Sequence, residues 1–423
     1  MKVIIIGCGA GGGTSAQFAR KMDRKAEIKI FEKGKLPQYS KCALPFVLSG
    51  DVAPHSIIEF SEEWFRRAKI DLQLNTEVLA IDFEGKSVET THGNEEYDSL
   101  IISTGAIPFS PVEPVGRTYF FRTLEDVKAI KREAKKAKKA VVVGAGLIGL
   151  EVSEALKKIG IDVSIIELMP EILPAMLDPD MAFLVRKKIE GKVEIFLNEG
   201  VKEINEGRQM EVITSSRAIK ADFVVVATGN KPNISIARKC NTKKAIVIDE
   251  KCMTSIPSVY ACGDCTQYKD IFGNEVIVGL GSIAVRQGIV AGINAVGGDE
   301  KLPPLLNART TKIFGIEIAA VGPLQKDLPF QPIIGKFRGN THPDYFEGDE
   351  IVVKVMGDEE GKICAAQVIG PGAAQKINAF ALAISSGMTF DEFSKVETAY
   401  APPVSPVIDV STIACDVAKR KVR

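Results

Sequence analysis

Histidine is scarce in this chain: there are three in 423 residues, and His55, His92 and His342 stand far apart. Without a histidine pair or a second C-x-x-C motif, the sequence lacks the ligand spacing of a zinc site. The charges balance at 54 Lys plus Arg against 54 Asp plus Glu, so they favour neither nucleic acid nor an anionic membrane as a partner. No apolar run approaches the ~18 residues of a membrane-spanning helix. We therefore expect no metal, nucleic-acid or membrane partner.

Cysteine is present but sparse. Eight scattered cysteines are too few for a disulfide scaffold and suit a reducing compartment. The chain opens directly into the apolar segment KVIII, without a basic and apolar leader. We therefore expect a cytoplasmic protein in which any important cysteine is chemically active. The length predicts two or three domains of ~100–200 residues.

A glycine-rich loop follows the first apolar segment. MKVIIIGCGAGG runs from an expected strand into Gly7, Gly9 and Gly12, and a helix-like TSAQFARKM and a second strand, EIKIFEK, come next. In such a unit the first glycine permits a tight turn, the second lets the backbone approach a pyrophosphate, and the third lets helix pack on strand. Glu32, 20 residues beyond Gly12, can accept hydrogen bonds from an adenosine ribose. The segment is predicted to bind a dinucleotide.

The same pattern recurs at residues 139–170. KAVVVGAGLIGLEVSEALKKIGIDVSIIELMP contains Gly144, Gly146 and Gly149, with Glu167 a further 18 residues on. Two complete motifs predict two different dinucleotides, although a decayed second copy is an alternative. Because no Arg or Lys follows Glu167 closely enough to receive a 2′-phosphate, we expect NADH to be preferred, with NADPH possible.

Two later segments end an apolar strand with Thr-Gly, SLIISTGAIP at 99–108 and DFVVVATGNKP at 222–232, and SIPSVYACGDCTQ contains Gly263-Asp264. With these segments and the two glycine loops, the chain resembles the pyridine nucleotide-disulfide oxidoreductases over nearly its whole length. The resemblance implies an α/β fold with two Rossmann-like domains, one for FAD and one for NADH, and a C-terminal α+β dimerisation domain.

The resemblance also implies domain boundaries and cofactor residues. An FAD domain is expected at 1–110 and 245–310, an NAD(P)H domain at 111–244 and the dimerisation domain at 311–423. Within the last, EIVVKVMGD and ICAAQVIG predict antiparallel strands with one buried face. The implied cofactor-binding residues are Gly7, Gly9, Gly12, Glu32 and Asp264 for FAD, Gly144, Gly146, Gly149 and Glu167 for the nicotinamide nucleotide, and Thr104, Gly105 and Gly229 in the Thr-Gly segments where the domains join.

The segment QYSKCALPFVLSG, residues 38–50, places a single cysteine about one helix beyond the first glycine loop. No other cysteine lies four or five residues from Cys42, so it cannot close a short intramolecular disulfide. We expect a mixed disulfide, a persulfide or a sulfenic acid instead. The neighbouring Lys41 can stabilise the thiolate. A buried, inert thiol is the alternative.

A second cysteine motif, Cys262-x-x-Cys265, flanks Gly263-Asp264. It is either a redox pair or a pair of small residues needed beside the FAD-contact aspartate, and we favour the structural interpretation.

Family members with one redox cysteine include NADH oxidases, NADH peroxidases and coenzyme A-disulfide reductases. The oxidases and peroxidases usually carry a histidine in the first glycine loop, where this chain has Ala10, which cannot do acid-base work. CALPF and ETAYAPPVSP resemble the reductases. This resemblance implies that Tyr400 acts across a dimer interface on the thiol of the other subunit; an ordinary interface aromatic is the alternative. Tyr345 stands where relatives often have Tyr-Tyr, and Phe346 lacks the second hydroxyl.

Coenzyme A is implied as a substrate or bound ligand. Gln17, Arg20 and Lys21 lie on the approach to Cys42, with Ser40 and Lys41 beside the thiol, and their cations could receive phosphates. A solvated helix end explains the first three equally well.

The implied function is hydride transfer from NADH or NADPH through FAD to Cys42, which reduces coenzyme A disulfide, persulfide or polysulfide in a homodimer. One alternative is an NADH oxidase that reduces oxygen. Another, from a different class, is a nucleotide-sensing or electron-transfer flavoprotein with an inert Cys42.

Overall fold

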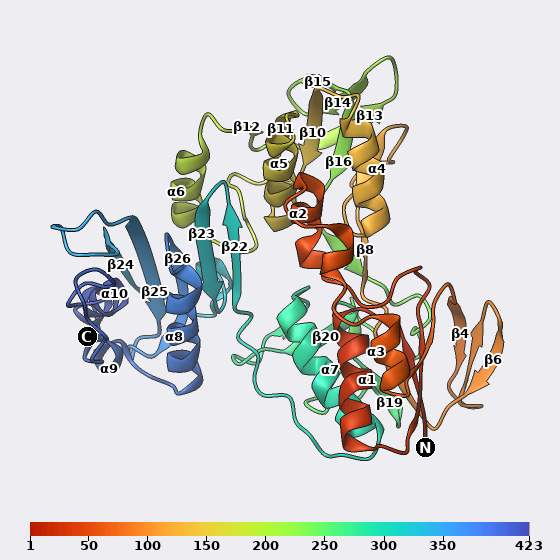
Figure 1. Cartoon of the computed structure of the whole chain (residues 1–423). Coiled ribbons are helices and arrows are strands. Elements are labelled where there is room, and N and C mark those ends of the chain that lie inside the picture. The colour runs from red at the N-terminus through yellow and green to blue at the C-terminus, as the bar shows by residue number, and fades with distance from the viewer. Residues whose placement is uncertain (423) are drawn as a thin grey trace. The chain divides into compact units, whose positions relative to one another are not determined.

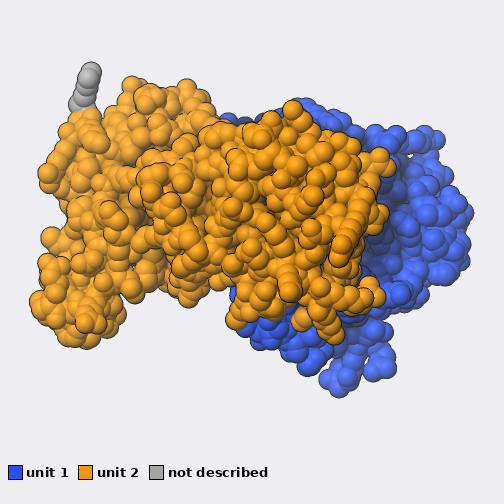
Figure 2. Space-filling view, turned by 90° about the horizontal axis from the view of Figure 1, so that it is seen from above, with its two compact units in different colours: residues 1–109, 122–128, 229–305 blue, residues 110–121, 129–228, 306–423 orange. Residues whose placement is uncertain are grey.

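The computed structural model describes residues 1–422, which form two compact units, coloured separately in Figure 2. Unit 1 comprises residues 1–109, 122–128 and 229–305, and unit 2 comprises 110–121, 129–228 and the chain from 306. Each unit contains one five-stranded parallel sheet.

The parallel sheet of unit 1 has the strand order β19-β7-β1-β2-β3. Its strands are β1 (Lys2–Ile6), β2 (Glu27–Phe31), β3 (Asp71–Gln73), β7 (Ser99–Ile102) and β19 (Val259–Ala261). Ile6 is in register with Phe31 and Ile102, and Ile102 with Ala261. The loops that follow β1, β2, β7 and β19 therefore meet at the carboxyl edge of the sheet, where open parallel sheets bind ligands.

Two helices of unit 1, α1 (Ala10–Met22) and α7 (Gly281–Ala295), pack closely on each other (Figure 1). A Cβ on Gly288 would lie 2.5 Å from the Gly11 carbonyl oxygen, and one on Gly292 would lie 2.2 Å from that of Ser15. Glycine is needed at both positions because the backbones are in contact. The predicted helix TSAQFARKM is confirmed, but it begins four residues earlier, at Ala10 directly after the N-cap Gly9.

The rest of unit 1 is made of short elements. The helices and 3-10 turns are η1 (Lys41–Ala43), α2 (Leu44–Ser49), η2 (Pro54–Ile57) and α3 (Glu62–Arg67). The strands are β4 (Val78–Asp82), β5 (Ser87–Thr90), β6 (Gly93–Glu96), β8 (Ala106–Pro108), β17 (Asn230–Pro232), β18 (Ile246–Val247), β20 (Thr266–Lys269) and β21 (Glu275–Val276). Antiparallel pairing of β8 with β17 brings the two Thr-Gly segments side by side.

The parallel sheet of unit 2 repeats that architecture, with the order β12-β11-β10-β16-β9. Its elements are β9 (Thr118–Phe120), β10 (Lys139–Val143), α5 (Leu147–Lys158), β11 (Asp162–Ile166), α6 (Pro179–Ile189), β12 (Glu194–Phe196) and β16 (Phe223–Val226), with an antiparallel sheet of β13 (Val201–Asn205), β14 (Met210–Thr214) and β15 (Ala218–Ala221). Helix α4 (Leu124–Ala134) precedes β10, and its residues from Ala129 on belong to unit 2.

The C-terminal part of unit 2 is an antiparallel sheet, β22-β23-β26-β25-β24, with helices packed on it. Its elements are β22 (Arg309–Ile313), β23 (Ile316–Val321), η3 (Gln325–Asp327), β24 (Ile333–Asn340), β25 (Glu350–Gly357), β26 (Ile363–Ile369), α8 (Ala373–Ser385), α9 (Phe390–Ser394) and α10 (Val410–Lys419). The antiparallel pairing of EIVVKVMGD with ICAAQVIG is confirmed, and the single buried face is wrong. Both strands are buried almost throughout, because α6, α8 and α10 all pack on this sheet.

A buried lysine in this sheet is paired with two carboxylates. Lys354 of β25 is buried and lies 2.8 Å from Asp178 and 2.7 Å from Asp180. A buried cation without such partners would be strongly destabilising. The predicted fold class, two Rossmann-like sheets and a C-terminal α+β sheet, is confirmed, whereas the residue boundaries of the three domains stay predictions.

Candidate functional site

The turn after β1 has the geometry that its glycines predict. Gly7 has a φ of +98°, and a Cβ on Gly12 would lie 1.9 Å from the Gly7 carbonyl oxygen. No described atom lies within 4 Å of a Cβ position on Gly9. The first and third glycines therefore permit close packing, and the second leaves backbone open at the N-terminus of α1. The cradle fits the pyrophosphate of a dinucleotide.

The carboxylate of Glu32 closes this loop from the end of β2. Its Oε2 accepts a hydrogen bond from the Cys8 backbone N–H at 2.7 Å, and its Oε1 accepts one from Gly34 N–H at 2.7 Å. Each carboxylate oxygen has two lone pairs, so both can still accept a ribose hydroxyl.

The loop after β10 is built in the same way. Gly144 has a φ of +104°, a Cβ on Gly149 would lie 1.9 Å from the Gly144 oxygen, and the Cβ position on Gly146 has no described atom within 4 Å. Glu167, 6% exposed, accepts from Ala145 N–H at 2.6 Å and from Met169 N–H at 2.8 Å. This second cradle fits a second dinucleotide.

The remaining predicted cofactor residues lie in left-handed turns or beside them. Gly105 has a φ of +67° and Gly229 one of +107°, and the Thr104 hydroxyl donates to the Asn233 carbonyl at 2.6 Å. Asp264 follows Gly263, whose φ is +84°.

Arg122 is a residue of this region that the sequence analysis missed. Its guanidinium donates to the Asp264 carboxylate at 2.9 Å. The two residues are 142 positions apart, so only the fold brings them together. A lone arginine between a strand and a helix gives no pattern by which it could have been found.

Cys42 differs from the other seven cysteines in its exposure. It lies in η1 and is exposed, whereas the others are buried. Burial raises the pKa of Cys262 to about 12 and that of Cys265 to about 11, so neither forms a thiolate near neutral pH. The geometry supports the structural interpretation of this C-x-x-C motif.

Several nearby charges affect the pKa of Lys41, the residue before Cys42. The side chain of Lys41 keeps accessible surface, but partial desolvation lowers its pKa, and the positive charge of Arg122 lowers it further. The carboxylates of Glu32 and Asp264 act in the opposite direction. Lys41 therefore lies in the electrostatic field of the charged residues around the first dinucleotide loop.

The predicted substrate residues fall into two groups. Arg20 donates to the carbonyl oxygens of Ala68, Lys69, Asp23 and Arg24, which uses four of its five N–H donors. This is a structural role, and its contact with a phosphate stays a prediction. By contrast Lys21 is exposed, with its ammonium 4.2 Å from the Phe18 ring centroid, and Gln17 and Ser40 are half-buried.

Tyr400 has a phenol neighbour within unit 2. Its hydroxyl oxygen lies 3.5 Å from that of Tyr345, and both rings are exposed. The hydrogen bond raises the pKa of Tyr345. The Phe346 ring lies 5.5 Å from the Tyr345 ring between centroids. Tyr345 is thus the hydroxyl that accompanies Tyr400, and the action of Tyr400 on Cys42 of another subunit stays a prediction.

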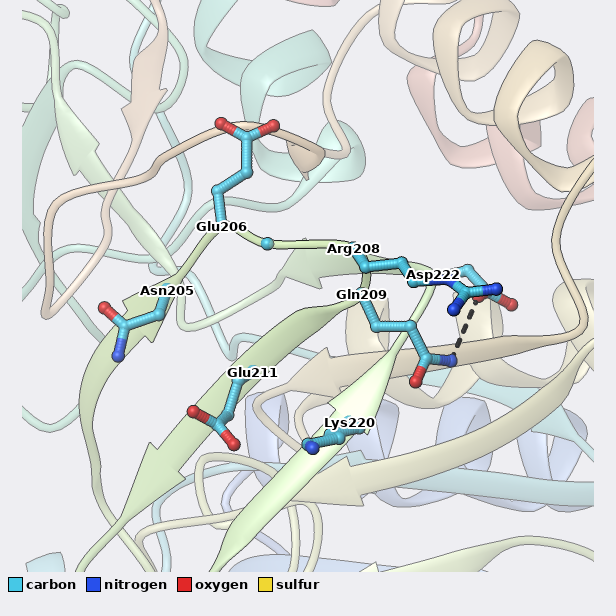
Figure 3. Close-up of a pocket in the computed structure, with 8 residues that line it drawn as sticks. Asn205, Glu206, Arg208, Gln209, Glu211, Lys220 and Asp222 are labelled. Atoms are coloured by element: carbon cyan, nitrogen blue, oxygen red, sulfur yellow. Dashed lines mark hydrogen bonds between the residues drawn. The ribbon is translucent and has the colours of Figure 1, made fainter.

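A hollow of about 710 Å³ lies on the β13–β15 sheet, away from both glycine loops in sequence (Figure 3). Gln209 donates to Asp222 at 3.4 Å, Glu211 stands opposite Lys220 in the strand register, and Figure 3 shows Glu206 directed away from them. These side chains do not converge on one point, so we do not regard the hollow as the functional site.

Within residues 1–422, no three His, Cys, Asp or Glu side chains gather to hold a metal ion. No helix in that part of the chain is both long and apolar enough to span a bilayer.

Comparison with known proteins gives consistent matches. The family described as pyridine nucleotide-disulphide oxidoreductase matches residues 1–288, and its dimerisation domain matches residues 309–411. A protein named NADH oxidase from Methanocaldococcus jannaschii is 36% identical, covering 100% of this chain and 99% of that protein. The NAD(P)H coenzyme A polysulfide/persulfide reductase of Pyrococcus horikoshii is 30% identical over 99% and 98% of the two chains. The solved structure of an NAD-dependent persulfide reductase from A. fulgidus has a TM-score of 0.95 at 32% identity, covering 100% of this chain and 83% of that one.

Proposed function

Because this chain belongs to the pyridine nucleotide-disulphide oxidoreductase family, we propose that it uses NADH or NADPH and FAD to reduce a small disulfide, persulfide or polysulfide through Cys42. One observation carries the proposal: of eight cysteines, Cys42 is the exposed one, in the segment that follows the first dinucleotide unit. Coenzyme A disulfide is included among the acceptors because the P. horikoshii relative is named for coenzyme A. The enzyme is proposed to be a cytoplasmic homodimer.

FAD, when bound, would supply the two-electron chemistry that amino-acid side chains lack. Gly7, Gly9 and Gly12 would hold the pyrophosphate of FAD, and Glu32 its adenosine ribose. Asp264 would bind the ribityl group, which joins the phosphate to the flavin ring. In unit 2, Gly144, Gly146 and Gly149 would hold NADH, with Glu167 on its ribose.

The chain's own chemistry is thiol–disulfide exchange at Cys42. Its thiolate attacks one sulfur of the substrate disulfide, the S–S bond breaks, and a Cys42 mixed disulfide forms as the first thiol leaves. The leaving thiolate takes up a proton, for which the phenol of the partner subunit's Tyr400 is the proposed donor. Two electrons from the nicotinamide nucleotide later release the second thiol, so one NADH and one proton are consumed for each disulfide.

The direct test replaces the thiol. We expect Cys42→Ser to retain FAD, and NADH should still bleach the absorbance of the bound flavin in the absence of oxygen. The rate of reduction of coenzyme A disulfide and polysulfide should fall by more than ~100-fold, because the attacking nucleophile is gone. Cys240→Ser removes a buried thiol as the matched control and should keep activity. Disulfide reduction by Cys42→Ser at the rate of the control would contradict the proposal.

An NADH oxidase is the second candidate, because the M. jannaschii relative has that name. The two functions separate on acceptor preference, measured as kcat/KM for oxygen against kcat/KM for coenzyme A disulfide and for polysulfide. We expect a sulfur acceptor to be preferred. A clear preference for oxygen would assign this chain to the oxidases.

Assembly is tested by mixing inactive subunits. Cys42→Ser subunits and Tyr400→Phe subunits should both be impaired, and mixed dimers should regain activity because each keeps one intact pair of Cys42 and the partner's Tyr400. Subunit exchange is verified with two affinity tags. Exchange without any recovery would mean that the two residues act within one chain.

A further inference from the structure

Gln287 of α7 is a buried polar side chain that the proposed chemistry does not use. It is 0% exposed. Its Oε1 accepts a hydrogen bond from the Gly263 backbone N–H at 2.8 Å and lies 3.1 Å from the Thr266 hydroxyl oxygen. Its Nε2 has no hydrogen-bond partner among the described residues. An amide kept at this depth with half of its capacity unused needs a reason beyond local folding.

A second buried amide on the same helix provides the contrast. Asn294, 5% exposed, donates to the carbonyl oxygens of Lys251 and Glu300 at 3.0 and 2.9 Å and accepts from Glu300 N–H at 2.7 Å. Both of its N–H donors and its oxygen are used to tie the end of α7 to neighbouring loops. Local structure therefore accounts for Asn294 and leaves Gln287 only partly explained.

The group that Gln287 holds is the turn that presents Asp264. Gly263 is left-handed, with a φ of +84°, and Thr266 closes the turn by donating to the Gly263 oxygen through its backbone N–H at 2.9 Å and its hydroxyl at 2.8 Å. The Gly263 N–H points the other way, into the protein, where Gln287 receives it. Without this acceptor the turn would have a buried, unpaired N–H, which is costly.

The same part of α7 is fixed to the first glycine loop. Gly288 adjoins Gln287, and a Cβ there would lie 2.5 Å from the Gly11 carbonyl oxygen. A Cβ on Gly11 would in turn lie 2.9 Å from the Cys262 sulfur, next to the turn. Gln287 therefore stands at the junction of the two segments that the proposed function assigns to FAD.

We propose that Gln287 is a positioning residue that holds the Gly263–Asp264 turn in register with the first glycine loop, so that both segments meet one flavin dinucleotide in a fixed geometry. It acts through Asp264 and does not itself contact the reacting atoms. This inference rests on the proposed FAD site and is independent of the acceptor reduced at Cys42.

The test compares two deletions of a buried amide on one helix. FAD is titrated into apoprotein of Gln287→Leu and Asn294→Leu, and the dissociation constant is read from quenching of flavin fluorescence. Both variants should unfold at a lower temperature, but only Gln287→Leu should bind FAD more weakly, by about tenfold or more, because the released turn lets Asp264 move. Gln287→Glu keeps an oxygen facing Gly263 and should retain FAD within about threefold of the wild type.

The outcomes separate cleanly. Equal FAD affinity in the two leucine variants, or loss of FAD by Gln287→Glu as severe as by Gln287→Leu, would reduce Gln287 to a packing residue and overturn the inference. If Gln287→Leu does not fold, Thr266→Val loosens the same turn from its other side and should also weaken FAD binding; unchanged affinity would again overturn it. Wild-type apoprotein that binds no FAD would instead refute the proposed function.

Discussion

The loop after β1 and the loop after β10 have the same glycine contacts and the same hydrogen bonds to a carboxylate. A Cβ on Gly12 or on Gly149 would lie 1.9 Å from the carbonyl oxygen of the first glycine in its loop. Glu32 and Glu167 each accept two backbone N–H groups, one from within the loop and one from two residues further along the chain. The same restraints in both loops support the proposal that each loop binds the pyrophosphate and ribose of a dinucleotide.

What differs is the surroundings. Beside the first loop, Arg122, Asp264 and Lys41 form a group of interacting charges, and the chain soon reaches the exposed thiol. After Glu167 the chain reads LMPEILP, without a cation or a cysteine. This difference supports the proposal that the first loop holds the cofactor that passes electrons to the thiol, and that the second holds the nicotinamide nucleotide that supplies them.

The largest expected effect comes from filling one loop or the other. Gly12→Ala should abolish stable FAD binding, because the Cβ forces α1 away from β1, whereas Gly149→Ala should keep FAD and bind NADH at least ~10-fold more weakly. Bound FAD is measured by absorbance after gel filtration, and NADH by rapid anaerobic titration.

Gly9→Ala and Gly146→Ala provide matched controls. Their Cβ positions have no described atom within 4 Å, so these variants should fold normally and lose affinity only for the ligand of their own loop. A Gly12→Ala protein that keeps its FAD would contradict the steric argument for the first loop.

Sequence reasoning predicted the fold well because its signals are local. The two runs of strand, glycine loop, helix and strand, with an acid at the end, follow from spacing within about 30 residues, and the structure confirms both sheets. The C-terminal strands were found by their alternation, but their burial was misjudged. Lys354 reads as a polar outward residue, and only its ion pairs with Asp178 and Asp180 explain why it lies inside.

Residues that depend on long-range packing could not be predicted. Arg122 meets Asp264, and Gln287 meets Gly263, through contacts 142 and 24 residues apart that no periodicity encodes. The local structure of the proline-rich stretch 401–405 is another feature for which the sequence analysis gave no prediction. That stretch folds into a turn closed by hydrogen bonds from Val404 and Ser405 to the Ala401 carbonyl oxygen.

A smaller effect concerns the choice of nicotinamide nucleotide at the second loop. The carboxylate of Glu167 should repel a 2′-phosphate, so kcat/KM for NADPH should be at least ~10-fold below that for NADH. Glu167→Gln removes the charge but keeps the shape, and it should narrow this ratio mainly through KM. Glu32→Gln, its counterpart in the first loop, should leave the ratio unchanged. A wild-type preference for NADPH would contradict the assignment.

The smallest effect tests the charges that only the first loop has. Burial, and then Arg122, lower the pKa of Lys41 from its ordinary 10.5, so the unfolded chain holds this proton more tightly than the folded one. Between the folded pKa and 10.5 the free energy of unfolding must therefore rise with pH, while at lower pH the folded state bears the full cost of the charge. FAD-free Lys41→Met should accordingly be slightly more stable than the wild type at pH ~7.5, and the difference should disappear as pH rises past 10.5. Urea unfolding of both proteins across this range measures it, with Lys41→Arg as the control whose charge does not titrate. A stability difference that stays constant with pH, or that favours the wild type at neutral pH, would show that the charge of Lys41 does not destabilise the folded state.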